Sequence, residues 1–252
     1  ATEAASNKVL SADGSWKTQA VTMPQGRLTL APGTPVMTGS FSSTTLYYTA
    51  YRGNSVPVLK GTRFETFTVP ASDLNVNLPG GLNGISDVYV YESSGLGLCV
   101  TTPWGGATRP NGLLISLSQE GIWTNSSAIN CAAGPANISA HQGTYVGTVK
   151  VSTGTIEFTT ETTLASSLFP KLFLYNAYNR VTVAASMTAS SSFDIPTTAT
   201  GVLLDPLLHI DYIAGLSESA VTVLLNSDIK LDPNADEAKI SIFLDGTAAR
   251  TY

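Results

Sequence analysis

The chain has 252 residues, of which 43% are hydrophobic and only 12% are charged, and its formal net charge is -5. Its 13 Lys and Arg residues form no run, so the basic face that attracts a phosphate backbone is missing and we expect no nucleic-acid partner. No apolar stretch approaches the roughly 20 residues of a bilayer span, and the first residues lack the hydrophobic segment of a secretory signal, so we expect neither membrane insertion nor secretory processing.

The first segment, residues 1–25, has few apolar side chains, among them Val9, Leu10 and Trp16. This content is too small for an independent core, so we predict an arm that docks on another surface, with a neighbouring subunit as the natural candidate. The alternative is a loose terminus. Trp16 favours docking, because an indole left in solvent exposes a large apolar surface.

From residue 26 onward, short β-strand patterns alternate with turn-forming residues. Residues 27–30 alternate in polarity, and residues 44–51 are dense in β-branched and aromatic side chains. Residues 56–60 predict an edge strand, because Pro57 cannot donate a ladder hydrogen bond. The other strands predicted in this half are 64–69, 74–78, 86–92 and 96–101, of which the last two form a hairpin across the Ser-Ser-Gly loop that ends at Gly95.

The second half continues the same pattern, with strands predicted at 145–151, 155–159, 171–183, 209–214, 220–231 and 239–244. Helical periodicity is rare, and only residues 161–168 could form one or two helical turns. Many short strands with a turn signal every 8–12 residues or so are typical of a β-sandwich. We therefore predict an all-β fold: an antiparallel β-sandwich or jelly-roll-like domain, a second smaller β module and an extended N-terminal arm.

Three parts follow from this prediction: an arm at 1–25, a main β-sandwich at 26–183 and a smaller C-terminal β domain at 184–252. The second boundary lies where Ser, Thr and Ala crowd together, at 184–199. The alternative is one large sandwich that includes this stretch as a strand and loop.

Two cysteines, Cys99 and Cys131, are too few for a disulfide scaffold and have no Cys or His at metal-site spacing nearby. They are either two buried thiols, which behave as small hydrophobic side chains, or partners in one bridge. A bridge would staple the segment between them once the protein leaves a reducing cytoplasm. The sequence leaves both states open.

The sequence has few residues that could act in catalysis or bind a metal. His141 lies in a predicted loop, and His209 would share a strand face with Asp211, two positions later. No nucleophile-elbow or phosphate-loop pattern occurs. The acids that could act in glycoside hydrolysis are better interpreted as strand-face or turn residues: Asp87, Glu92, Glu157 and Glu161. We predict no catalytic, cofactor-binding or metal-binding residues, and no enzymatic activity.

Aromatic side chains are the remaining residues that could bind a ligand or a protein partner. We select Trp104, Tyr48, Tyr51 and Trp123 as candidate contacts to a glycan or a protein partner, because rigid amphipathic rings stack on sugars. Trp104 is the best candidate, since a Pro-Trp-Gly-Gly loop carries it. The alternative role for Trp104 is a lid over the core or a subunit contact.

The stretch Leu46-Tyr-Tyr-Thr-Ala-Tyr-Arg-Gly-Asn54 resembles a module of structural proteins of tailed bacteriophages, especially fibre-like and virion-surface proteins. The resemblance recurs in order at 27–36, 56–58, 85–91, 145–149 and 174–181, and Asn-Ala-Tyr-Asn-Arg-Val within the last segment is its most specific element. It covers about 27–181. Between Trp104 and Tyr145 this chain departs from the pattern with a longer insertion, so partner contacts of that region are not carried over. No catalytic residues are carried over either.

The resemblance implies a structural protein of a tailed bacteriophage particle: a surface fibre, spike or capsid-decoration subunit anchored through its N-terminal arm. Such a subunit would be assembled in the bacterial host cytoplasm and would lie at the virion surface. We expect a homo-oligomer, with a homotrimer as the first expectation, in contact with capsid or tail proteins. The alternative is a tail-fibre protein that binds host surface polysaccharide. A depolymerase is the weakest of the hypotheses, because acid pairs are sparse.

Overall fold

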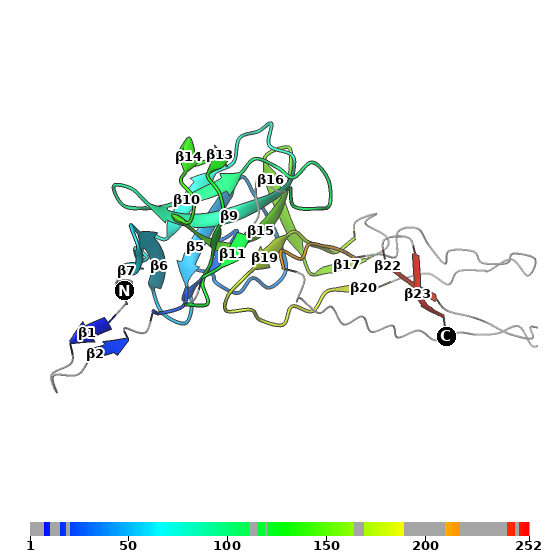
Figure 1. Cartoon of the computed structure of the whole chain (residues 1–252). Helices are drawn as coiled ribbons and strands as arrows, with labels where there is room; N and C mark the ends of the chain where they lie inside the picture. The colour runs from blue at the N-terminus through cyan, green and yellow to red at the C-terminus, as the bar shows by residue number, and fades with distance from the viewer. Residues whose placement is uncertain are drawn as a thin grey trace, which may run out of the picture. The chain divides into compact units, whose positions relative to one another are not determined.

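The computed structural model describes residues 8–10, 16–18, 21–110, 115–118, 120–163, 169–188, 210–216, 241–244 and 247–251. These residues form strands and connecting turns, with no helix among them. Several antiparallel sheets pack together as a β-sandwich (Figure 1). The predicted all-β class is confirmed.

The chain falls into two compact units, one of Ala1–Ser190 with Pro206–Ser219 and one of Ser191–Asp205 with Ala220–Tyr252. In the second unit the described residues form one antiparallel hairpin, β22 (Ser241–Leu244) with β23 (Thr247–Thr251). The division into an arm, a main domain and a C-terminal domain stays a prediction. The strand expected at 220–231 lies outside the described residues.

The largest sheet of the described part of the chain has twelve strands, with β9 (Gly84–Glu92) and β15 (Gly143–Ser152) at its centre. The predicted hairpin is present, because β9 pairs antiparallel with β10 (Leu96–Thr101) from the Glu92–Leu96 pair onward. The main path runs β14-β13-β10-β9-β15-β16-β18-β21. The other strands on this path are β13 (Ile129–Ala133), β14 (Asn137–Ile138), β16 (Thr155–Thr159), β18 (Lys171–Leu172) and β21 (Asp211–Tyr212).

Four strands join this sheet beside the main path. They are β4 (Ser40–Ser43), which pairs with β16, β11 (Ile115–Leu117), which pairs with β12 (Trp123–Asn125), and β19 (Leu174–Asn176), which pairs with β15. Strand β12 also pairs with β15, through Thr124 and Thr144.

A second layer covers one face of this sheet. It consists of a three-stranded sheet, β3 (Gly26–Thr29), β5 (Thr45–Ala50) and β8 (Leu74–Asn77), and a hairpin of β6 (Ser55–Lys60) and β7 (Arg63–Thr68). Alternate side chains of the two layers meet in one apolar core, and each buried side chain of this kind contributes about 2 kcal/mol. Its members include Leu28, Leu46, Val56, Val58, Val88, Val90, Val100, Val146, Val149 and Ile156.

The opposite face of β9 and β15 is also buried. Tyr89 and Tyr145 point there, with ring centroids 5.7 Å apart, and Cys99 of β10 joins them. Loops and short strands from elsewhere in the chain cover this second core through Trp104, Ile129, Ile138, Tyr175 and Leu216. Successive side chains of β9, β10 and β15 therefore point alternately into the first core and the second core.

Several segments differ from the sequence prediction. Strands β4 and β11–β14 lie where the sequence analysis predicted none. The turns of helix expected at 161–168 are wrong where the chain is described, because Glu161–Thr163 form strand β17, parallel to β20 (Ser186–Thr188); two β-branched threonines favour this extended state. The single strand expected at 171–183 is instead two short strands, and no strand follows Asn176 before β20. In the predicted arm, β1 (Lys8–Leu10) pairs antiparallel with β2 (Trp16–Thr18).

Candidate functional site

A buried carboxylate, Asp87, lies in β9 and is paired on several sides. Arg109 donates two hydrogen bonds to it, from Nε to Oδ2 at 2.7 Å and from Nη2 to Oδ1 at 2.8 Å. Thr148 Oγ1 donates a third, to Oδ1 at 2.9 Å. The Asp87 side chain has no exposed surface. Three donors hold this carboxylate in place, which is the arrangement of a structural ion pair rather than of a general acid or base.

The guanidinium of Arg109 is enclosed by aromatic rings. It lies 4.7 Å from the ring centroid of Trp104 and 5.6 Å from that of Tyr145, and Nη2 donates to the backbone oxygen of Gly215 at 2.9 Å. Burial acts to lower the pKa of Arg109, but the hydrogen bonds and the charge of Asp87 outweigh burial and raise this pKa overall. One side chain thus joins β9, the loop after β10 and the segment that contains Gly215.

Gly215 lies too close to this cluster for any side chain. A Cβ atom there would collide with the hydroxyls of Tyr145 and Thr148, which are 2.6 Å apart and share a hydrogen bond. Burial raises the pKa of Tyr145. The hydroxyl of Tyr89 is also buried, and among the described residues it has no hydrogen-bond partner. The close fit around Gly215 indicates that this cluster is a packing site.

A second set of long-range hydrogen bonds joins β3 to the end of β19 and to the segment that follows it. Asn176 Oδ1 accepts from the backbone N–H of Leu28 at 2.6 Å, and Asn176 Nδ2 donates to the oxygen of Leu28 at 3.2 Å. The guanidinium of Arg27 donates to the backbone oxygen of Asn179, whose own Nδ2 donates to the oxygen of Gly26 at 3.2 Å. We refer to Arg27, Leu28, Asn176 and Asn179 as the β3 clasp.

Cys99 in β10 and Cys131 in β13 form a disulfide, which is one of the two states that the sequence left open. The two strands are neighbours, with Thr101 opposite Cys131. The bridge joins residues 32 positions apart. It therefore closes a loop that contains Arg109, β11 and β12.

Two of the four aromatic candidates lie in the cores. Tyr48 is 1% exposed, and its hydroxyl accepts a hydrogen bond from the backbone N–H of Gly26 at 3.1 Å. Trp104 is 9% exposed and lies under Arg109. This burial argues against the predicted glycan contact at Tyr48 and Trp104, because protein covers their ring faces. Trp104 instead takes the alternative role of a lid over a core.

The other two aromatic candidates are half-buried. The ring centroid of Tyr51 lies 5.3 Å from the guanidinium of Arg27 and 6.0 Å from that of Arg52. Trp123 packs against the second core, and its backbone N–H donates to the hydroxyl of Tyr178 at 2.7 Å. A contact of Tyr51 or Trp123 with a partner stays a prediction.

The residues chosen for the docking arm lie in the β1–β2 hairpin. Val9 is opposite Lys17, and Leu10 is opposite Trp16. Docking through Val9, Leu10 and Trp16 stays a prediction.

Three of the four acids singled out from the sequence pair with cations. Besides Asp87, Glu92 lies 2.7 Å from Lys60, and Glu157 lies 2.7 Å from Lys171. In the described ranges no group of three or more His, Cys, Asp or Glu side chains could hold a metal ion. His209 lies outside the described residues, so its predicted shared face with Asp211 is untested.

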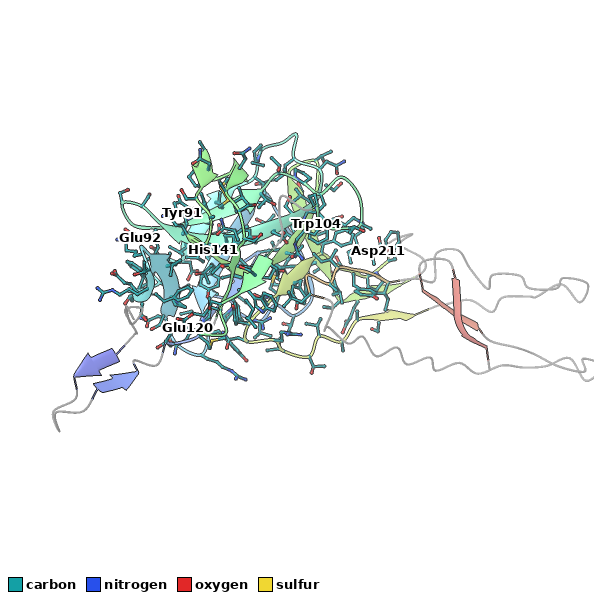
Figure 2. The ribbon with its side chains drawn as sticks, viewed as in Figure 1. Tyr91, Glu92, Trp104, Glu120, His141 and Asp211 are labelled. Atoms are coloured by element: carbon teal, nitrogen blue, oxygen red, sulfur yellow. A yellow bond between two sulfur atoms is a disulfide. The ribbon has the colours of Figure 1, made fainter. Side chains whose placement is uncertain are left out.

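A pocket of about 310 Å³ opens between the β6–β7 hairpin and the β11–β12 hairpin. Two of its lining residues, His141 and Glu120, are labelled in Figure 2. A volume of this size is at the lower end of the range for small-molecule sites. Hydroxyl groups, an imidazole and a carboxylate share its lining with apolar side chains. The lining residues are Leu59, Thr62, Phe64, Ser116, Leu117, Ser118, Glu120, Thr124 and His141.

Three polar side chains of the pocket lie in a row. Thr124 Oγ1 is 3.3 Å from Ser116 Oγ and 3.3 Å from His141 Nδ1. Each hydroxyl can donate or accept, and the role of Nδ1 depends on the imidazole tautomer. We refer to Ser116, Thr124 and His141 as the polar row.

Hydrogen bonds to Asn125 fix the backbone around His141. His141 has a left-handed conformation, with φ of 64°, and its N–H donates to the oxygen of Asn125 at 2.8 Å. The fully buried Asn125 side chain donates to the oxygens of Ser127 and Ser139 and accepts from Gly143 N–H at 2.8 Å. These bonds fix the loop that presents the imidazole.

Sequence reasoning singled out His141 but did not predict the pocket. Phe64 and Ser116 are more than 50 positions apart, and nothing local in either segment indicates that the two hairpins meet. The only signal was a histidine in a predicted polar loop. Long-range packing creates the site.

No protein-family model, curated protein or solved structure matches the chain. In the described part of the chain, no helix is long and apolar enough to cross a membrane.

Proposed function

We propose that the chain is a non-enzymatic structural protein of a tailed bacteriophage particle, a surface fibre, spike or capsid-decoration subunit. The observation that carries the proposal is the β3 clasp. The two ends of the resemblance, at 27–36 and 174–181, meet there through the side-chain hydrogen bonds of Asn176 with Leu28 and of Arg27 with the backbone oxygen of Asn179. Because segments almost 150 residues apart act as one unit, they support a shared fold rather than a chance likeness of separate pieces.

The physical character of the first unit agrees with this role. A disulfide and a buried ion pair brace an antiparallel sandwich, and charged residues make up only 12% of the chain. Such a domain suits persistent contacts between copies of itself more than electrostatic capture of a charged partner. We propose a homotrimer at the virion surface, assembled in the host cytoplasm and anchored to capsid or tail proteins through residues 1–25.

This proposal predicts that the chain is a component of purified particles. Mass spectrometry of gradient-purified phage should find it in many copies per particle, and native mass spectrometry of the isolated protein should give a trimeric mass. A variant that lacks residues 1–25 should keep its sandwich but fail to enter particles. Particles without the chain, or full incorporation of the truncated variant, would contradict the proposal.

A second candidate function is binding of host surface polysaccharide by a tail-fibre protein. The pocket between the β6–β7 and β11–β12 hairpins favours it, because the pocket combines apolar and hydroxyl-bearing side chains. The buried Tyr48 and Trp104 do not support it. Binding of sugars by the purified protein tests this candidate separately from particle assembly.

A further inference from the structure

We propose that copies of this chain join head to tail through two different apolar surfaces and close a ring of three. We refer to Met23 and Leu117 as the β11 patch and to Ile210 and Tyr212 as the β21 patch. The β11 patch of one copy packs against the β21 patch of the next. This inference rests on the homotrimer proposed above and names the surfaces that hold it together.

The two patches contain most of the large apolar side chains that stay exposed. Among the described residues such side chains are few, and the four in the patches are between 38% and 53% exposed. The remaining one, Val183, lies between β19 and β20. A single exposed apolar side chain is ordinary, but apolar side chains that gather in pairs point to a contact surface.

The β11 patch lies at the β11–β12 hairpin. Leu117 is the last residue of β11 and is opposite Trp123 in the strand register. The methyl group of Met23 lies beside the hairpin turn, because a Cβ atom at Gly121 would be 4.0 Å from it. The turn is closed by the N–H of Gly121, which donates to the oxygen of Ser118 at 3.0 Å. A hydrogen-bonded hairpin therefore presents this patch.

The β21 patch lies in an extended segment whose alternate side chains have different surroundings. The N–H of Ile213 donates to the oxygen of Leu172 at 3.3 Å, and the Ile213 side chain packs against the second core. Ile210 and Tyr212 are two positions apart, so they share a face, and both are exposed. Figure 2 labels Asp211, which lies between them in the chain.

The two patches are connected to opposite ends of β15. Strand β9 occupies one edge of β15 from Gly143 to Val151. On the other edge, β12 joins β15 at Thr144, and β16 joins it at Val151 and Ser152. The path then continues from β16 through β18 to β21. A strand of 10 residues spans about 30 Å, so the two patches of one copy do not cover each other.

The chemistry of the patches favours a second copy over an anionic partner. Neither patch contains a charged side chain, and between Arg180 and Lys230 the sequence has no Lys or Arg. Aromatic and thioether side chains are enriched in the buried centres of protein interfaces. The thioether of Met23 and the isobutyl group of Leu117 match the ring of Tyr212, because sulfur and aliphatic groups pack well against aromatic rings.

Contact between unlike patches covers both of them in every copy. If each patch met its own equivalent, one contact would leave the other patch in solvent. In a head-to-tail ring each subunit gives one patch and receives the other, and the ring closes without a free patch. A two-fold dimer could also join unlike patches, but its cross-linked product stops at two chains.

The test is cross-linking of the full chain with a short bismaleimide. The double variant Leu117→Cys, Tyr212→Cys places one thiol in each patch, whereas Cys99 and Cys131 do not react because they are bonded to each other. At concentrations at which native mass spectrometry gives a trimer, the double variant should form covalent dimers and trimers. Each single-cysteine variant should stay monomeric on a denaturing gel. Thr66→Cys with Tyr212→Cys is the control and should also stay monomeric, because Thr66 is exposed on β7, outside both patches.

Tyr212→Asp tests the same contact without a cross-linker. The ring is partly exposed in the single copy, so the variant should fold, but it places a carboxylate in an apolar contact. The Kd of the trimer should rise by about tenfold or more. Thr66→Asp is the matched control and should leave this Kd unchanged.

The outcomes separate this contact from the virion role. No cross-link in the double variant, covalent dimers from a single-cysteine variant, or a product that stops at two chains would overturn the ring. Equal trimer dissociation of Tyr212→Asp and Thr66→Asp would do the same. A monomeric unmodified chain that is present in purified particles would overturn this inference and leave the virion role intact, whereas particles without the chain would overturn the virion role alone.

Discussion

Asp87 and Arg109 illustrate how one buried pair can hold distant parts of a chain. Arg109 reaches Asp87 in β9, the ring of Trp104 and the backbone of Gly215. Removing either charge leaves the other in a low-dielectric site without compensation, and this loss costs more free energy than the intact pair contributes. The acid thus has a structural role that its position in a strand pattern does not reveal.

At the residue scale we predict that Asp87→Asn lowers the free energy of unfolding by about 3 kcal/mol. The reason is that Arg109 keeps its charge but loses its carboxylate. Urea unfolding monitored by fluorescence measures the change. Glu65→Gln is the control, because its partner Arg63 is exposed and the atoms are 3.4 Å apart; it should change stability by less than about 0.5 kcal/mol. Equal effects of the two variants would contradict the structural role of Asp87.

Strands β9, β10 and β15 are buried on both faces, and the elements that cover their second face are loops and short strands. The disulfide between Cys99 and Cys131 restrains these covering elements, because it closes the loop that holds Arg109 and both strands of the β11–β12 hairpin. Without the bridge, the unfolded chain would gain the freedom that the closed loop denies it.

At the element scale we predict that the double variant Cys99→Ala, Cys131→Ala is less stable by about 3–4 kcal/mol, the chain-entropy value for a loop of this length. Thermal unfolding with and without a reducing agent measures it. Reductant should lower the Tm of the unmodified chain and leave that of the double variant unchanged. A Tm of the unmodified chain that does not respond to complete reduction would refute the prediction.

Considered as a whole molecule, the first unit buries several tyrosine hydroxyls. Burial raises the pKa of Tyr48, Tyr89 and Tyr145, and raises that of Tyr178 to about 12. Tyrosines of the unfolded chain ionise near pH 10 or so. Above that pH the unfolded state binds fewer protons than the folded state, so stability must fall as pH rises.

We therefore predict that the Tm does not change with pH below about pH 9 and that it falls steadily between about pH 10 and pH 12. Tyrosinate absorbance should rise together with unfolding rather than before it, apart from exposed rings. Lys60, whose pKa is raised by its hydrogen bond to Glu92, would act in the same direction, so Lys60→Met provides the control. If the variant loses the whole alkaline transition, the tyrosines are not its cause.

Local sequence patterns predicted many of the strands of this protein, but not all of them. A period of two in side-chain polarity predicted the longer strands, such as β5, β9 and β15, and a short Gly-ending loop predicted the β9–β10 hairpin, because both depend on neighbours in the chain. The patterns failed at Glu161–Thr163, where helical and extended states are close in propensity and pairing with β20 decides.

Tertiary structure decided everything that depends on distant residues meeting. Alternation places Tyr48 and Tyr89 on one face or the other but does not say that both faces of the sheet are covered. It likewise cannot pair Cys99 with Cys131, Asp87 with Arg109, or Phe64 with Ser116 across a pocket. These contacts come from the packing of two layers, and packing is a property of the whole chain rather than of any segment.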